Sequence, residues 1–183
     1  EVRNATVQPF KKAPGLYGID ATVNASKSGA TAWIDTEGFG LDLPLVYDRP
    51  IVVDRIKGQL KASWQKDLLL LHDGVLMAET DIHPAAVRFA MDIPLNAVAA
   101  KETPVAMYLD VAFSGAPLAV RNNYIPKKIP SALDQWLHSA LLAGDVEQGI
   151  FLWRGPFNNF GAGTQSMQLA ADISDATIQY QPD

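Results

Sequence analysis

The segment from Ile56 to Gln65, IKGQLKASWQ, decides the fold class because its side chains alternate strictly in polarity. Ile56, Leu60 and Trp64 fall on one face of an extended chain, and lysine, glutamine and serine side chains fall on the other. Such alternation indicates a β-strand with one dry face and one wet face. Strands of this kind are typical of antiparallel sheets that bury a single side.

The same alternation recurs at residues 19–26, 107–113 and 167–180. Turn-forming pairs, among them Ser28-Gly29 and Asp73-Gly74, stand between the apolar runs, and several connections are short enough for hairpins. The simplest topology is therefore an antiparallel meander. The sequence predicts a mainly β (α+β) fold.

One segment has helical spacing instead. Its apolar residues follow the i, i+3, i+4, i+7, i+8 pattern of an amphipathic helix. Ser131 is a suitable N-cap and Gly144 a natural C-terminal stop, so we expect one helix over about 131–143. A helix this short needs a docking surface, and the apolar face of the sheet is the obvious one. The residues expected to dock are Leu133, Trp136, Leu137, Ala140 and Leu141.

Composition excludes several functions. The chain has 183 residues, enough for one domain with its own core. It lacks cysteine, which rules out disulfide and thiolate chemistry. Its net charge of -5 argues against binding to nucleic acid. No apolar run reaches the roughly 20 residues of a membrane-spanning helix.

The sequence also lacks a recognisable catalytic or metal-binding pattern. His72, His83 and His138 have no further ligands at zinc-site spacing, and no GxSxG or phosphate-loop motif is present. Scattered pairs such as Asp35 with Glu37 do not define an acid/base site. We therefore expect no enzyme activity, no cofactor and no metal.

Three groups of motifs, in order along the chain, resemble the YhdP family of AsmA-like proteins from Gram-negative bacteria. The first is PGLYGIDA at 14–21, followed by LDLP at 41–44 and DRIKG at 54–58. The second is the predicted helix with its flanks, from YIP at 124–126 to RGPF at 154–157. The third is DATIQY at 175–180. Position 21 departs from the family pattern, because it is alanine where glycine is usual.

The resemblance implies a large protein anchored in the inner membrane, with residues 1–183 forming a single β-rich fragment of its periplasmic portion. It implies a curved sheet whose apolar concave face passes phospholipid acyl chains between the inner and outer membranes. The expected partners are phospholipid and neighbouring segments of the same chain, which would continue the sheet. Membrane contact would come only through the anchor of the parent protein.

Two functional hypotheses remain open. In the first, inward-facing strand residues contact acyl chains, and the helix either covers or plugs the groove. The residues expected to line the groove are Ile19, Val23, Leu60, Trp64, Leu109, Val111, Phe113, Leu169 and Ile173. In the second, the same residues form a closed sheet–helix core of a structural or interaction module that binds no ligand.

Overall fold

Nine strands form one sheet in which each strand pairs antiparallel with the next along the chain. The computed structural model describes residues 1–9, 14–44, 46–96, 105–125, 127, 129, 131–156 and 164–179. The strands are β1 (Val2–Val7), β2 (Gly15–Ala25), β3 (Gly29–Asp42), β4 (Ile51–Gln65), β5 (Leu68–Glu79), β6 (Pro84–Pro94), β7 (Ala106–Pro117), β8 (Leu141–Pro156) and β9 (Ser166–Ile178). Between β7 and β8 lie a 3-10 helix, η1 (Leu118–Asn123), and an α-helix, α2 (Ser131–Ser139).

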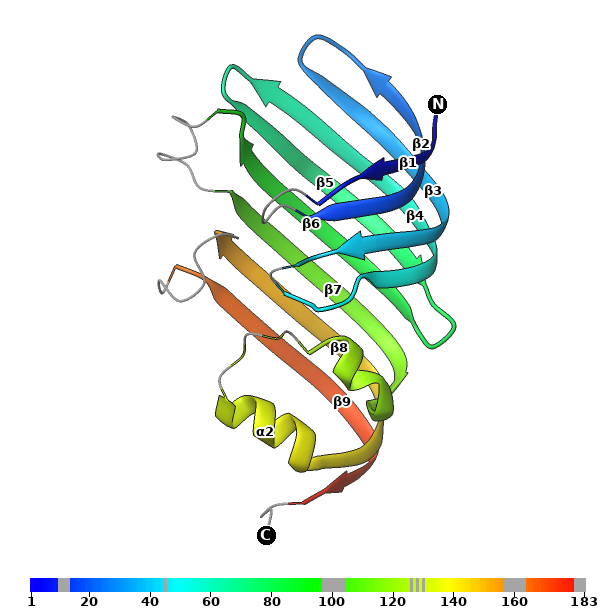
Figure 1. Cartoon of the computed structure of the whole chain (residues 1–183), viewed down its shortest axis with the longest axis vertical. Coiled ribbons are helices and arrows are strands. Elements are labelled where there is room, and N and C mark those ends of the chain that lie inside the picture. Colours follow the sequence, from blue (N-terminus) through cyan, green and yellow to red (C-terminus); the bar gives the residue numbers. More distant parts are fainter. Residues whose placement is uncertain are drawn as a thin grey trace.

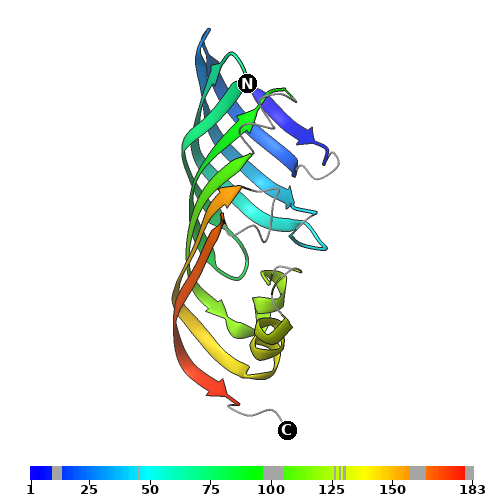
Figure 2. The same cartoon turned by 90° about the vertical axis from the view of Figure 1, so that its left-hand side faces the viewer.

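This topology confirms the predicted antiparallel meander. The sheet is open and curled, and α2 lies on its concave side together with the bent ends of the first strands (Figures 1 and 2). Three residues of the motifs that carry the family resemblance lie outside the described residues: Pro126, Phe157 and Tyr180.

At one end of the sheet, the strands bend at a crease in β2 and β3. Gly18 and Gly38 have left-handed φ values of 73° and 65°, which glycine adopts without steric cost. The register of the strand pair shifts at this point. The Thr36 side chain is fully buried and bonds to the backbone of Asp20 at this shift. Its Oγ1 accepts a hydrogen bond from Asp20 N at 2.9 Å and donates one to Asp20 O at 3.0 Å. Beyond the crease, the ends of the strands project in front of the sheet (Figure 1).

Two apolar clusters stabilise the concave side. The first lies near the crease, where the buried residues are Val53, Ile56, Leu76 and Ala78. The second lies beneath the helices, where the buried residues are Ala116, Leu118, Leu141 and Val146. Leu137 of α2 and Phe113 of β7 pack against this second cluster. The helices therefore close only the end of the sheet formed by β7, β8 and β9.

The predicted helix is four residues too long, because α2 ends at Ser139 and β8 begins at Leu141. Ala140 O accepts a hydrogen bond from Gln179 N at 2.8 Å, so from this residue on the backbone bonds to the chain at the end of β9 instead of continuing the helix. Burial of a leucine such as Leu141 stabilises by about 1.5–3 kcal/mol. One more helical residue gains at most about 0.3 kcal/mol. Gly144, expected to stop the helix, instead lies within β8.

Candidate functional site

An unbroken row of apolar or glycine residues crosses the concave face from β1 to β9. Its members are register partners in successive strand pairs, so they lie side by side on one face. With eight interstrand spacings of about 4.8 Å, the row is roughly 38 Å long. We call it the concave row; it consists of Val2, Ala21, Ile34, Gly58, Leu76, Val87, Val111, Phe151 and Leu169.

The neighbouring row on the convex face has a different composition. It runs from Thr22 on β2 through Gln59, Arg88 and Asp110 to Gln168 on β9. Charged and amide side chains thus interrupt the convex surface one residue away from the concave row. Of these two rows, only the concave row is apolar without interruption.

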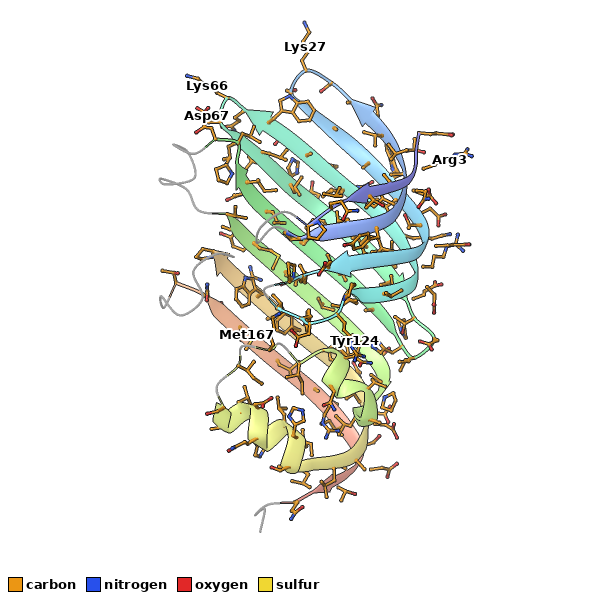
Figure 3. All side chains as sticks on the ribbon, in the orientation of Figure 1. Arg3, Lys27, Lys66, Asp67, Tyr124 and Met167 are labelled. Carbon is orange, nitrogen blue, oxygen red and sulfur yellow. The ribbon has the colours of Figure 1, made fainter. Side chains whose placement is uncertain are left out.

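Burial along the concave face varies with position. Leu76, near the crease, has only 9% of its surface exposed, whereas Leu169 on β9 has 63%. Val23 and Met167, in the rows next to it, are 43% and 46% exposed, and Trp64, near the end of β4 on the same face, is 37% exposed. The concave face is therefore covered at its centre and presents apolar side chains to solvent towards both sides of the sheet. Figure 3 shows Met167 on β9.

All nine residues expected to line a groove lie on this face, by strand alternation and register. Val23, Trp64 and Leu169 are exposed, and the other six are partly buried. Phe113 and Ile173 differ from the rest because they pack against the cluster under the helices. Whether the nine contact a ligand stays a prediction.

Sequence reasoning missed Leu76, Val87 and Phe151, the members of the concave row on β5, β6 and β8. The convex positions beside them are also apolar: Val75 and Met77 are 46% and 51% exposed. With apolar residues on both faces, period-two alternation vanishes from these strands. Only the register of the sheet reveals them.

The five residues expected to dock the helix divide into two groups. Ala140 and Leu141 are buried, and Leu137 packs against the cluster beneath the helices. Leu133 and Trp136 are 38% and 50% exposed. The helix therefore contacts the sheet through its C-terminal turn and the residues that follow, at the end of the sheet formed by β7, β8 and β9.

A polar cluster stands at the edge of the covered region. His83, 8% exposed, places its Nε2 2.9 Å from the Tyr124 hydroxyl, and the Tyr47 hydroxyl donates to Tyr124 O at 3.1 Å. Burial raises the pKa of Tyr47 above its ordinary value of 10.0, and the neighbouring Tyr124 adds to the rise. The pKa of Tyr124 is raised by burial and then by the charge of Asp81. These groups bond to one another and thereby join two loops to the start of β6.

Charged groups gather on the convex face instead. Desolvation alone would raise the pKa of Asp35, but hydrogen bonds and charges from Arg55 and Lys57 hold it below 3.8. The hydrogen bond from Lys61 is the main reason that the pKa of Asp73 is lowered. In the part of the chain that the structure describes, no cluster of three or more His, Cys, Asp or Glu residues could hold a metal ion.

The convex face also carries a shallow hollow of about 420 Å³. Its floor consists of Ala86, Ala112 and Ala170, and Met77 and Ile150 lie in line with them across the strands. This hollow is on the opposite side of the sheet from the concave row, so the two surfaces are separate.

Comparison with known proteins gives one match. A family model described as YhdP protein matches residues 1–183, the whole chain, which confirms the resemblance carried by the sequence motifs. No curated protein and no solved structure matches the chain. At the level of the family, the match indicates a lipid-transport-related protein that is membrane-anchored and periplasmic. Among the described helices, none is long and apolar enough to cross a membrane.

Proposed function

Because the chain belongs to the YhdP family, we propose that its concave face binds phospholipid acyl chains as one segment of a transfer path between the inner and outer membranes. The observation that carries this proposal is the concave row, apolar across all nine strands and solvent-exposed at Leu169. An apolar surface left open in a periplasmic protein needs an apolar occupant.

The chemistry of such a path is simple. Each methylene group that leaves water for the concave face is stabilised by about 0.8 kcal/mol. A repeated row of Val, Leu, Ile and Phe side chains offers no polar group that would hold one lipid in one place. The headgroup remains in water on the open side of the sheet, because burying it unpaired would cost several kcal/mol. These features suit movement along the row more than tight binding.

The edges of the sheet support a continuing path. Within the described strands, β1 and β9 each pair with a single neighbour and so present backbone groups for a further strand. Neighbouring segments of the same parent chain are the proposed occupants of these edges. A longer piece of the parent protein would then show protection of the β9 amides from hydrogen exchange that the 183-residue chain lacks.

A structural role is the second candidate function. The apolar cluster beneath the helices favours this role for the end of the sheet formed by β7, β8 and β9. Ala116, Leu118 and Val146 are each 7% exposed and form a closed sheet–helix core. This part of the fold needs no ligand. We assign it to stabilising the sheet end, while the open part of the concave row binds lipid.

The experiment compares two matched variants. Leu169, 63% exposed, lies on the concave face, and Ile150, 50% exposed, lies on the convex face of the adjacent strand. Purified Leu169→Gln and Ile150→Gln proteins are incubated with phosphatidylethanolamine and phosphatidylglycerol vesicles, separated, extracted and analysed by mass spectrometry. We expect Leu169→Gln to retain less phospholipid than the unmodified chain and Ile150→Gln to retain the same amount. Absence of lipid from every protein would leave the structural module as the remaining function.

A further inference from the structure

Two loops from distant parts of the chain meet in front of the concave face. Lys127 N donates to Val46 O at 2.9 Å, and Lys127 Nζ donates to Tyr47 O at 3.3 Å and pairs with the Asp48 carboxylate at 3.0 Å. The Tyr47 hydroxyl donates to Tyr124 O. We call this contact, between Val46–Asp48 on one side and Tyr124 and Lys127 on the other, the seam.

The seam closes the front of the sheet where its strands are short. Strands β5, β6 and β7 have 12, 11 and 12 residues, against 15 in β4 and 16 in β8. The described part of the loop between β3 and β4 lies on the concave side (Figure 2), and Lys127 N bonds to Val46 O there.

The seam is also connected to the floor of the concave face. Tyr124, which Figure 3 places beside η1, contacts His83 edge-on, with ring centroids 5.3 Å apart. The His83 ring in turn lies 6.1 Å from that of Phe113 on β7. Parting Val46–Asp48 from Tyr124 would therefore open a way to the surface beside Tyr124 and His83, next to Phe113 on the concave face.

The bonds across the seam are of a kind that breaks easily. The Asp48 side chain is 82% exposed, and ion pairs at that exposure are weak in water. Both sides of the seam are loops, which open at lower free energy than paired strands. A lipid that threaded beneath a permanently closed seam would carry its charged headgroup into an apolar region, which is costly. A wall that opens lets the headgroup stay outside.

We propose that the seam is a lateral gate through which phospholipid acyl chains enter the covered part of the concave face from the side. This inference rests on the proposed function, because it assumes that the concave face takes up lipid. The gate opens by parting Val46–Asp48 from Tyr124 and Lys127, while the strands stay paired.

A reversible disulfide tests the gate, since the chain has no cysteine of its own. In Val46→Cys/Lys127→Cys the two backbones are already hydrogen-bonded, near the Cα separation of roughly 4.4–6.8 Å that a disulfide requires. The matched control is Ala86→Cys/Ala112→Cys, register partners on the convex face. The probe is a phosphatidylethanolamine–phosphatidylglycerol vesicle with a trace of phospholipid bearing a fluorescent acyl chain. We expect oxidation to slow uptake about tenfold in the seam variant only, and reduction to restore it.

A second variant works without any cross-link. Lys127→Ala removes the ion pair and the bond to Tyr47 O but keeps the backbone bond to Val46. We expect uptake about two to five times faster, with the final amount of bound lipid unchanged. Equal uptake rates in the oxidised and reduced seam variant, or an unchanged rate in Lys127→Ala, would overturn the gate while leaving lipid binding intact. No uptake by the unmodified chain would overturn the proposed function and the gate together.

Discussion

Substitution of Thr36 tests whether the crease depends on one side chain. Thr36→Val keeps the shape but removes both bonds to the backbone of Asp20, which run at 2.9 and 3.0 Å. Each lost hydrogen bond costs about 0.5–1.5 kcal/mol, and an unpaired donor or acceptor that stays buried adds about 1–3 kcal/mol. Because Asp20 is only partly buried, water can reach part of this site, and we expect a total loss of about 2–4 kcal/mol.

The matched control is Thr36→Ser, which keeps the hydroxyl and loses one methyl group. Its expected cost is about 0.8 kcal/mol. Urea unfolding followed by circular dichroism gives both values from the shift in midpoint at constant slope. If Thr36→Val proves as stable as Thr36→Ser, the hydroxyl does not hold the crease, and the curvature must arise from the glycines and the apolar cluster instead.

Three further changes test the concave side. Tyr47→Phe should lower the free energy of unfolding by about 0.5–1.5 kcal/mol at neutral pH. A tyrosine whose folded pKa is raised above 10.0 stabilises the fold below that pH and loses the effect as pH rises, so the alkaline destabilisation of the unmodified chain should shrink in this variant. Phospholipid with brominated acyl chains should quench tryptophan fluorescence according to the face of the sheet. We expect stronger quenching in a variant that keeps only Trp64, on the concave face, than in one that keeps only Trp33, on the convex face. Equal quenching in the two variants would contradict binding of lipid to the concave face. Gly38→Ala should lower the free energy of unfolding by about 1–2 kcal/mol. The whole cost comes from the left-handed φ of 65°, because nothing lies within 4 Å of the added Cβ. An unchanged midpoint of thermal unfolding would show that the crease does not require glycine.

The strands that sequence reasoning located are those with one wet face. Lys57, Gln59 and Lys61 alternate with apolar partners in β4, and this pattern survives in the structure as convex and concave sides. Strands β5, β6 and β8 escaped detection because convex residues such as Met77 and Ile150 are apolar as well. Their place follows from pairing with neighbours, which alternation within one strand cannot reveal.

The predicted helix shows a second limit. Its apolar spacing continues past Ser139, and propensity alone extends it to about residue 143. In the fold, Ala140 and Leu141 gain more by entering the sheet beside β9 than by prolonging the helix. Tertiary pairing therefore overrides local preference at this boundary, and Leu133 and Trp136 of α2 remain exposed.

By itself, the sequence determined the antiparallel meander and the family, because alternation and ordered motifs are local properties of the chain. Only the tertiary structure decided how the concave face is closed. Closure depends on residues far apart in sequence: Thr36 with Asp20 at the crease, and Val46 with Lys127 at the seam. Burial and hydrogen bonding between such residues exist only after the sheet has formed, so no pattern along the chain records them.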